Sequence, residues 1–437
     1  MDVFQMGPHD QLLEIVATLT LALVLFLDAV KLQIDELGKR WLVPVLILGP
    51  GTGIIIALGA TTLAFVVGFS WIMAFIGGAI LASTDPVMLR DIVRDQRIPR
   101  SVRQVLKIEA GTNDLVVLPV ILVLIAVAGH QGGDAPGWAI FMAKLLVLGP
   151  AIAFALGASG SWLMTKVDAK MGIRQEHQAL FGVGLVLASY AAATAAGGDG
   201  FLGAFFAGLA VVILNQSLCD CFMDYGETTS EMAMLLAFVL FGIVLSGILS
   251  TVDVIPILIL AALVIFVIRP GVLGVVLARA NMSWPAHGFV AWFGPRRLNP
   301  LLLALLVVQA GLPGGEVLLA TVGVVVLASV TIHGATATPF TAWYGRRAAK
   351  ETLAEEREST AAGLFAHEET EVRLIAPAEV MELMSSPEPP LILDIRIRST
   401  YENSGQRIPG DIRMMPDQVV EWASECVGTG LVVVYCA

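Results

Sequence analysis

The chain has 437 residues, of which 57% are hydrophobic and only 14% are charged. Soluble domains carry about 25% charged residues, so this composition excludes an ordinary soluble protein and predicts a polytopic membrane protein. The net charge of −11 is concentrated in an acidic region between Glu351 and Glu382, which indicates a solvated segment. The first apolar stretch runs into Asp28 and Lys31 without a small-residue cleavage site, so no signal peptide is expected.

Apolar stretches recur from the start of the chain to about residue 342. A helix needs about 20 apolar residues to cross the hydrocarbon core of a bilayer, and we count eleven stretches near that length. They lie near residues 12–30, 41–66, 70–90, 105–128, 139–160, 176–196, 200–215, 232–249, 253–278, 287–310 and 316–342.

The charges of the connecting loops predict the orientation of the chain in the membrane. Loops with Lys and Arg alternate with loops that have neither, which are 67–69, 129–138, 197–199, 250–252 and 311–315. Because positive loops stay in the cytoplasm, the N-terminus is expected outside and the C-terminus in the cytoplasm. A bacterial-type inner (plasma) membrane fits this multi-pass pattern.

The composition changes after Tyr344. We therefore divide the chain into a membrane domain (1–344), a charged cytoplasmic linker expected to be helical (345–375) and a soluble tail (376–437). In the tail, PAEVMELMSS and QVVEWASEC are typical of helices, whereas PLILDIR and GLVVVYCA are typical of buried strands, so an α/β fold is expected.

The stretch ILASTDPVMLRDIV, residues 80–93, predicts a broken membrane helix. Pro86 has no backbone N–H, and it disfavours helical geometry at Asp85. We expect the helix to open near Thr84 and Asp85, where freed carbonyls and opposed half-helix dipoles can bind a cation. A simple proline kink is the alternative.

The stretch LKIEAGTNDLVVLPV, residues 106–120, places polar side chains within an apolar segment. Glu109 and Asn113 are four residues apart and share a helix face, and Asn113 and Asp114 can both point into a cleft. Ionised residues inside a membrane default to a functional hypothesis. The alternative is a helix start capped at the interface, with its Asn and Asp solvated.

Two further polar residues lie in predicted spans. Arg269 in VIFVIRPGVLG needs an anion as its partner. Glu109 is the best candidate, because Asp114 would have to remain available for another role. The alternative is that the Arg269 side chain snorkels to the membrane interface. His333 in the last span is interpreted as a helix-packing residue, with pH sensing as the other possibility.

A second interrupted span, FVAWFGPRRLNPLLLAL, contains Gly294, Pro295 and Pro300. Interrupted helices at matching positions of two halves indicate a transporter with inverted repeats. The stretches 41–66, 70–90 and 105–128 would then correspond to 253–278, 287–310 and 316–342.

At these motifs the chain resembles the cation:proton antiporter-1 family, which includes NhaP-type sodium/proton antiporters and animal sodium/hydrogen exchangers. The resemblance covers about residues 11–345 and rests on the order of TLALVLFLDAV, ASTDPV, EAGTND, GDGFLGAFFAGL, IRPGV, WFGPRR and HGATATP. It implies an all-α polytopic fold of the NhaA/NhaP type with inverted repeats, two broken crossing helices and about 11 of the usual 13 helices. A homodimer in the lipid bilayer is also implied.

The resemblance also implies residue roles. Asp114 would alternately bind a proton and a monovalent cation (Na⁺, or K⁺ or Li⁺), and its neighbour Asn113 is typical of electroneutral relatives. The remaining implied roles concern Thr84 and Asp85 on the unwound helix, the Glu109–Arg269 ion pair, and Arg296 as the arginine of a Gly-x-Arg-Gly signature. No cofactor, transition metal or nucleic acid is expected.

The chain departs from the family in three places. Ala110 stands where the family has a serine that helps to hold the ion, one turn before Asp114. Arg297 replaces the last glycine of the signature, and the family usually has two more helices before LTLALVLF.

The tail resembles a rhodanese-like domain in LILDIRIRSTYENSGQRIPGDI and VVVYCA. Cys436 would match the cysteine that opens the persulfide-binding loop. Since the sequence ends one residue later, that loop is incomplete, and we expect the tail to be inactive as a sulfurtransferase.

The expected function is secondary active exchange of a monovalent cation for H⁺. A cation channel or regulatory membrane subunit is one alternative, but a channel needs no titrating carboxylate beside two broken helices. A membrane-tethered sulfurtransferase is another, and it rests on Cys436 alone.

Overall fold

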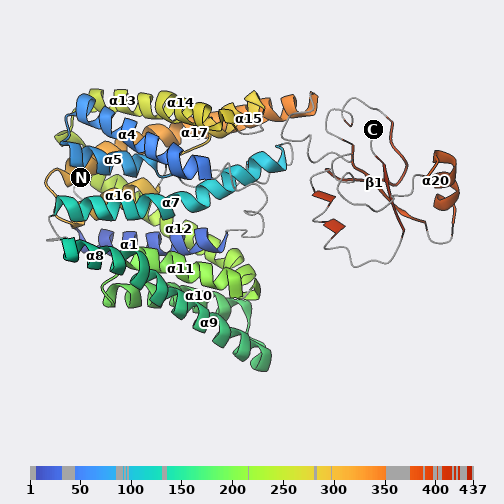
Figure 1. The fold of residues 1–437 in the computed structure, drawn as a ribbon, viewed down its shortest axis with the longest axis horizontal. Coiled ribbons are helices and arrows are strands. Elements are labelled where there is room, and N and C mark those ends of the chain that lie inside the picture. Colours follow the sequence, from blue (N-terminus) through green and yellow to red (C-terminus); the bar gives the residue numbers. More distant parts are fainter. Residues whose placement is uncertain are drawn as a thin grey trace. The chain divides into compact units, whose positions relative to one another are not determined.

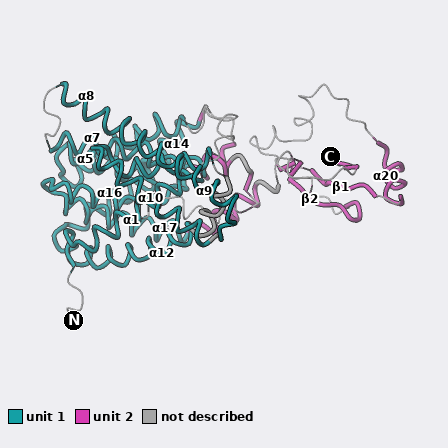
Figure 2. The backbone as a smooth tube through the Cα atoms, turned by 90° about the horizontal axis from the view of Figure 1, so that it is seen from below, with its two compact units in different colours: residues 1–89, 107–277, 291–335 teal, residues 90–106, 278–290, 336–437 magenta. Residues whose placement is uncertain are grey.

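The computed structural model (Figure 1) describes residues 6–31, 45–84, 92, 95, 98–129, 135–214, 216–279, 283–296, 298–350, 375–386, 389–396, 401, 406–415, 418–419, 422–423 and 431–435. Internal contacts divide the chain into two compact units (Figure 2). Unit 1 comprises residues 1–89, 107–277 and 291–335, and unit 2 comprises residues 90–106, 278–290 and 336–437.

The predicted polytopic architecture is confirmed. Eight helical stretches of the described residues are long and apolar enough to cross a membrane, and three apolar helices are shorter. The long stretches are Gln11–Val30, Ile47–Val67, Val102–Ala128, Ala135–Met171, Glu176–Ala195, Gly226–Thr251, Val254–Val276 and Gly315–Arg347; the short helices are Trp71–Ala82, Gly200–Leu214 and Leu298–Gln309. Each of them overlaps one of the eleven apolar stretches predicted from the sequence.

The helices carry the following bounds in chain order. They are α1 (Gln11–Val30), α4 (Thr52–Thr62), α5 (Trp71–Ala82), α7 (Arg100–Ala128), α8 (Ala135–Ala143), α9 (Gly149–Met171), α10 (Gln175–Ala195), α11 (Gly200–Leu214), α12 (Gln216–Ile248), α13 (Val254–Ala262), α14 (Arg269–Val276), α15 (Trp284–Trp292), α16 (Leu298–Gln309) and α17 (Gly315–Lys350). Four π-helical stretches, at Ile47–Gly51, Leu63–Val67, Lys144–Leu148 and Leu263–Ile268, join some of them into longer spans.

Unit 1 contains two groups of packed helices. Helices α1, α9, α10, α11 and α12 form one group, and α4, α5, α13 and α14 form the other, with α16 in contact with α5 as well as with α1 and α12 (Figure 1). The close approach of α1 and α11 depends on Gly208, because a side chain there would overlap the carbonyl of Phe26. Residues of α1 from Thr20 to Val30 are buried on all sides, as expected for a helix inside a bundle.

Both predicted helix interruptions are present. Helix α5 ends at Ala82, and Ser83 is extended with φ −62° and ψ 137°. The helix therefore ends two residues before the predicted break at Thr84, while Asp85 lies outside the described residues. In the second half, residues 293–296 are not helical and separate α15 from α16.

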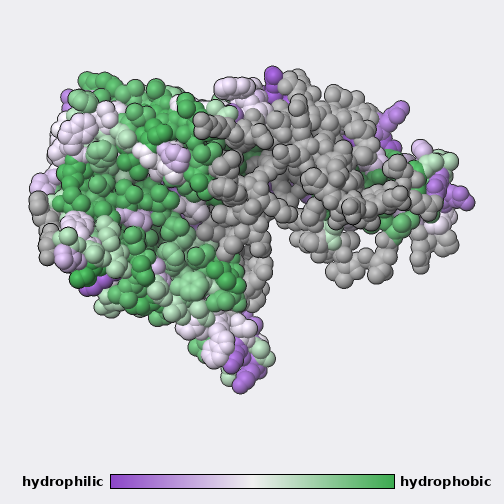
Figure 3. Space-filling model, viewed as in Figure 1, coloured by the Kyte–Doolittle hydropathy of each residue, from purple (hydrophilic) through white to green (hydrophobic). Residues whose placement is uncertain are grey.

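The surface of unit 1 suits an apolar surrounding. Its visible face in Figure 3 is mostly hydrophobic over the helices. Large apolar side chains are exposed along them, such as Phe65 at 76%, Leu180 at 69% and Val239 at 61%. A soluble protein rarely exposes apolar patches on this scale, whereas lipid accommodates them.

The tail contains a small α/β arrangement. Helix α20 (Pro377–Met384) precedes a parallel three-stranded sheet in the order β2 (Ile412–Arg413), β1 (Leu391–Asp394), β3 (Val432–Tyr435). Ile392 and Val433, which are neighbours in the β1–β3 register, are both buried. Of the predicted linker, residues 345–350 continue α17, and 351–374 lie outside the described residues, as does Cys436.

Candidate functional site

Asp114 is held through both oxygens of its carboxyl group. The Ser83 hydroxyl donates to Oδ1 at 2.6 Å, and the Asn299 amide nitrogen Nδ2 donates to Oδ2 at 2.5 Å. All three side chains are buried, with Asp114 only 4% exposed. The donors come from the two interruptions: Ser83 directly follows α5, and Asn299 is the second residue of α16. The carboxyl group of α7 therefore links the ends of the two broken helices.

Three oxygen atoms on residues that belong to this group or adjoin it in the sequence have no hydrogen-bond partner within the described part of the chain. They are Thr84 Oγ1, Asn113 Oδ1 and Asn299 Oδ1, and all three are buried. A buried polar atom without a partner loses the hydration it has in water. Hard monovalent and divalent cations prefer such carboxylate, hydroxyl and amide oxygens. The residues present therefore have the chemistry to hold a cation as cargo.

Arg269 and Glu109 form a buried ion pair. Arg269 Nη2 donates to Glu109 Oε1 at 2.6 Å and to the Phe293 carbonyl at 3.3 Å, and both charged side chains are 3% exposed. The guanidinium also lies directly against the Cα of Gly294. Arg269 is therefore not at the interface, and its charge is balanced by Glu109 rather than by Asp114.

Arg296 joins the first interruption to the second. Its Nε donates to the Leu81 carbonyl at 2.6 Å, and its backbone N–H donates to Ser329 Oγ at 3.0 Å. Carbonyls in the last turn of a helix lack partners within that helix, and a cation there is favoured by the helix dipole. Arg296 thus supplies a donor to the end of α5, which breaks at Ala82.

His333 is buried in α17 and lies within hydrogen-bond distance of two neighbours. Its Nδ1 is 2.9 Å from the Ser329 carbonyl, and its Nε2 is 3.2 Å from the Trp292 carbonyl. Its ring also lies against that of Trp292, with centroids 5.5 Å apart. These contacts favour the helix-packing interpretation, and a pH-related role stays a prediction.

Several predicted residues lie beyond what the structure describes. Asp85 and Arg297 are among them, and nothing is described of the Ala110 side chain. Of the predicted ion-site residues, Thr84, Asn113 and Asp114 are described, and all three are buried.

Comparison with known proteins gives the family of the chain. The family described as "Sodium/hydrogen exchanger, transmembrane" matches residues 3–343, more than half of the chain. The chain belongs to this family. Similar curated proteins include the K(+)/H(+) antiporter NhaP of Alkalimonas amylolytica, 24% identical over 79% of this chain and 60% of that protein. The K(+)/H(+) antiporter NhaP2 of Shewanella sp. (strain MR-4) is 26% identical over 74% of this chain and 56% of that protein.

This member of the sodium/hydrogen exchanger family spans less than two thirds of the length of either relative. Among solved structures, the fold is similar to that of the sodium proton antiporter MjNhaP1 from Methanocaldococcus jannaschii, with a TM-score of 0.61 and 19% identity. That likeness covers 76% of this chain and 86% of the other. The expected antiporter fold is therefore confirmed.

Two site residues of this exchanger-family chain were not predicted from its sequence. Ser83 and Asn299 stand 31 and 185 residues from Asp114, and a neutral polar residue near a helix end is common and does not by itself indicate an ion site. Their one distinguishing signal is placement, since each adjoins a proline-marked interruption, Pro86 or Pro300.

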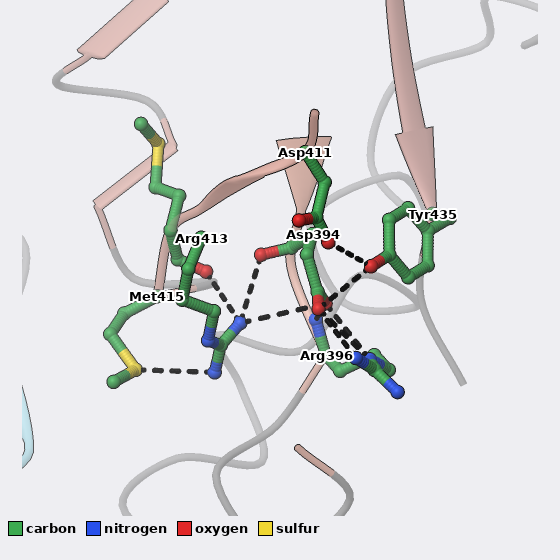
Figure 4. Close-up of polar contacts among 7 residues, drawn as sticks. Asp394, Arg396, Asp411, Arg413, Met415 and Tyr435 are labelled. Atoms are coloured by element: carbon green, nitrogen blue, oxygen red, sulfur yellow. Dashed lines mark hydrogen bonds and ion pairs between the residues drawn. The ribbon is translucent and has the colours of Figure 1, made fainter. Parts of the chain in front are cut away.

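The tail has its own polar cluster, centred on buried Asp394 (Figure 4). Arg396 binds both carboxylate oxygens, with Nη2 2.6 Å from Oδ2, and the Tyr435 hydroxyl donates to Oδ2 at 2.9 Å. Arg413 donates to the Asp394 carbonyl at 2.9 Å, and Tyr435 also contacts Asp411. Burial alone would raise the pKa of Asp394, but the hydrogen bonds hold that pKa below its usual value. The cluster fastens β1 to β2 and β3.

Proposed function

We propose that the chain exchanges a monovalent cation for a proton across a membrane. The observation that carries the proposal is Asp114, a buried carboxyl group that accepts hydrogen bonds from residues at two broken helices. The named relatives are K(+)/H(+) antiporters, and the similar solved structure is a sodium proton antiporter. Na⁺, K⁺ and Li⁺ all suit the oxygen ligands, so the proposal is limited to monovalent cations.

The mechanism is competition for one carboxyl group. Asp114 holds either a proton or a partly dehydrated cation, because the carboxylate charge can balance only one of them. Burial disfavours the bare carboxylate, while oxygen ligands beside it favour the cation-bound form. If movement of the helices exposes the loaded site to alternate sides, one cation crosses for each proton that returns.

Electroneutral exchange follows from the charges of the neighbours. Asn113 carries no charge, and Glu109 is paired with Arg269, so the proposal assigns the cargo to the single carboxylate of Asp114. A single carboxylate that exchanges one monovalent cation for one proton moves no net charge. This stoichiometry is part of the proposal.

The cellular setting is proposed from the loops and the family. The chain would lie in a bacterial inner membrane with its C-terminus in the cytoplasm, and it would form a homodimer. The tail would be an inactive rhodanese-like module; its parallel sheet and its Asp394–Arg396 contact support an α/β assignment.

The direct test is Asp114→Asn in everted membrane vesicles with a pH-sensitive dye. Wild-type vesicles should show proton movement on addition of Na⁺, K⁺ or Li⁺, and the rate should fall at acid pH, where protons occupy the site. The variant, in which an amide cannot be deprotonated, should lose the response to every cation. Undiminished cation-dependent proton movement in Asp114→Asn would refute the assignment.

A further inference from the structure

The side chains of Ser83 and Asn299 do more than fill space beside Asp114. One hydroxyl and one amide reach the two oxygens of the same carboxyl group, at 2.6 Å and 2.5 Å. Both side chains are fully buried, so water does not compete for these hydrogen bonds. In this arrangement both donors match the ionised form of the carboxyl group, because the acid would present a donor of its own on one oxygen.

The Ser83 hydroxyl and the Asn299 amide can also form hydrogen bonds with the protonated form of Asp114. A serine hydroxyl rotates, and it can donate or accept. An asparagine side chain carries a donor nitrogen and an acceptor oxygen, and the two exchange places when the amide turns over. Asn299 Oδ1 has no hydrogen-bond partner among the described residues, so such a turn breaks no described hydrogen bond of that oxygen.

We propose that Ser83 and Asn299 are positioning residues of the ion site, which match Asp114 in each of its loaded states. They donate to the ionised carboxylate. They accept from its proton or give oxygen ligands to the bound cation after the hydroxyl rotates and the amide turns. This inference rests on the proposed exchange function and adds two residues to it.

The pair also connects the two helix interruptions. Ser83 follows the end of α5, and Asn299 lies in the first turn of α16. When Asp114 on α7 exchanges a proton for a cation, the hydrogen bond at each of the two interruptions therefore changes. Loss of either bond should weaken cation binding more than it affects the fold.

Among the described residues, the other charged or titratable groups named at this site each have a contact of their own, although Arg296 Nη1 and Nη2 lack a hydrogen-bond partner there. Glu109 of α7 pairs with Arg269 of α14, the Arg296 Nε donates to Leu81, and His333 of α17 contacts Ser329. A shift in the pH dependence of exchange in a Ser83 or Asn299 variant would thus report on Asp114.

The test compares Ser83→Ala and Asn299→Leu in the full chain, in everted vesicles, over a range of cation concentrations and pH. Ser83→Ala removes one oxygen, and Asn299→Leu removes the amide at similar volume. Each should raise the KM for the cation about tenfold, the effect of ~1.4 kcal/mol. Each should also move the pH of half-maximal exchange upward by about one unit, because the lost donor favoured the carboxylate over the acid. The maximal rate should change less than KM.

Two further variants separate positioning from packing. Thr321→Val is the matched control, because Thr321 is fully buried and donates to the carbonyl of Val317 in its own helix; its KM and pH profile should equal those of wild type. Ala110→Ser added to Ser83→Ala places a hydroxyl one turn before Asp114, and it should return both values toward wild type.

The outcomes distinguish the two proposals. If wild type shows no exchange, or if Asp114→Asn keeps it, the proposed function fails. If wild type exchanges and Asp114→Asn does not, while Ser83→Ala and Asn299→Leu match Thr321→Val in KM and pH profile, the function stands and the positioning role is overturned. Should Asn299→Leu not accumulate in the membrane, the smaller Ser83→Ala change decides.

Discussion

At the scale of single residues, the sequence predicted the buried ion pair of Arg269 and Glu109, but it did not predict how the pair is packed. A mid-span arginine requires an anion, and the sequence offers Glu109 in another predicted span, 160 residues earlier. Removal of one partner of a buried pair costs about 3–5 kcal/mol, since it leaves a charge uncompensated. What the sequence cannot show is that the guanidinium lies on the Cα of Gly294.

This contact makes Gly294 a sensitive position. A methyl group at residue 294 would overlap Arg269 Nε and Cζ, so Gly294→Ala should displace the guanidinium from Glu109 and from the Phe293 carbonyl. The expected loss of stability approaches the ~3–5 kcal/mol of a broken buried pair. Thermal unfolding of the detergent-solubilised protein measures it.

The control is Gly274→Ala in α14. Outside its own helix backbone, no heavy atom of the described residues lies within 4 Å of the position that a Cβ would take at Gly274. Alanine is also favoured over glycine inside a helix by up to about 1 kcal/mol. Gly274→Ala should therefore melt at the same temperature as wild type or higher. Equal melting of Gly294→Ala and wild type would contradict the predicted clash.

Ser83 and Asn299 mark the limit of prediction from sequence at this scale. The carboxyl group of Asp114 was identifiable because a charge in an apolar segment is costly and therefore informative. A serine and an asparagine near helix ends carry no comparable signal, because an uncharged polar side chain is far less costly in an apolar segment than a charge. Only the three-dimensional packing of α5, α7 and α16 brings their side chains onto the same carboxyl group.

At the scale of elements, hydropathy and proline placement predicted most of what the structure contains. The eleven apolar stretches and both interruptions follow from segment length, Pro86 and Gly294–Pro295. The π-helical stretches, such as Lys144–Leu148, were not predicted. The hydropathy of a segment is the same whether its carbonyls accept from the N–H four residues later, as in an α-helix, or five residues later, as in a π-helix. Tertiary packing therefore decides between the two helix types.

The loop before α11 provides a prediction about pH. Asp199 accepts from the Leu202 N–H at 2.8 Å and caps the helix. Burial is the main influence on this carboxyl group, and it raises the pKa of Asp199 to about 6 despite that hydrogen bond. An unfolded aspartate has a pKa near 3.9. Protonation therefore stabilises the fold, with the full contribution below about pH 4 and its loss as pH rises through about 6.

Asp199→Asn keeps the capping oxygen but does not titrate. At pH 8 the variant should be more stable than wild type, by at most ~3 kcal/mol and less after solvent screening. At pH 4 the difference should vanish, because both side chains are then neutral. Melting temperatures of the two proteins at both pH values test this expectation, and a difference that is the same at pH 4 and pH 8 would contradict it.

At the scale of the whole molecule, the described contacts of the ion site all lie within unit 1. Its residues extend from Leu81 to His333, whereas α20 and the sheet of the tail begin beyond the linker. The sequence predicts a boundary after Tyr344, where charged residues replace apolar ones, whereas unit 2 also includes residues 90–106 and 278–290 and begins its last segment at residue 336. The sequence did not predict the short strand β2, since two residues carry too little periodicity to be recognised.

A chain that ends at Lys350 should therefore retain exchange. We expect the KM for the cation to equal that of the full chain, because Ser83, Asp114 and Asn299 keep all of their described contacts. A regulatory tail would change the maximal rate and leave the KM unaltered. The measurement is cation-dependent proton movement in everted vesicles, with the amount of membrane-inserted protein determined in parallel. The same truncation carrying Asp114→Asn serves as the inactive control. Loss of exchange at a normal protein level would mean that the tail helps to form the working site, against the expectation from unit 1.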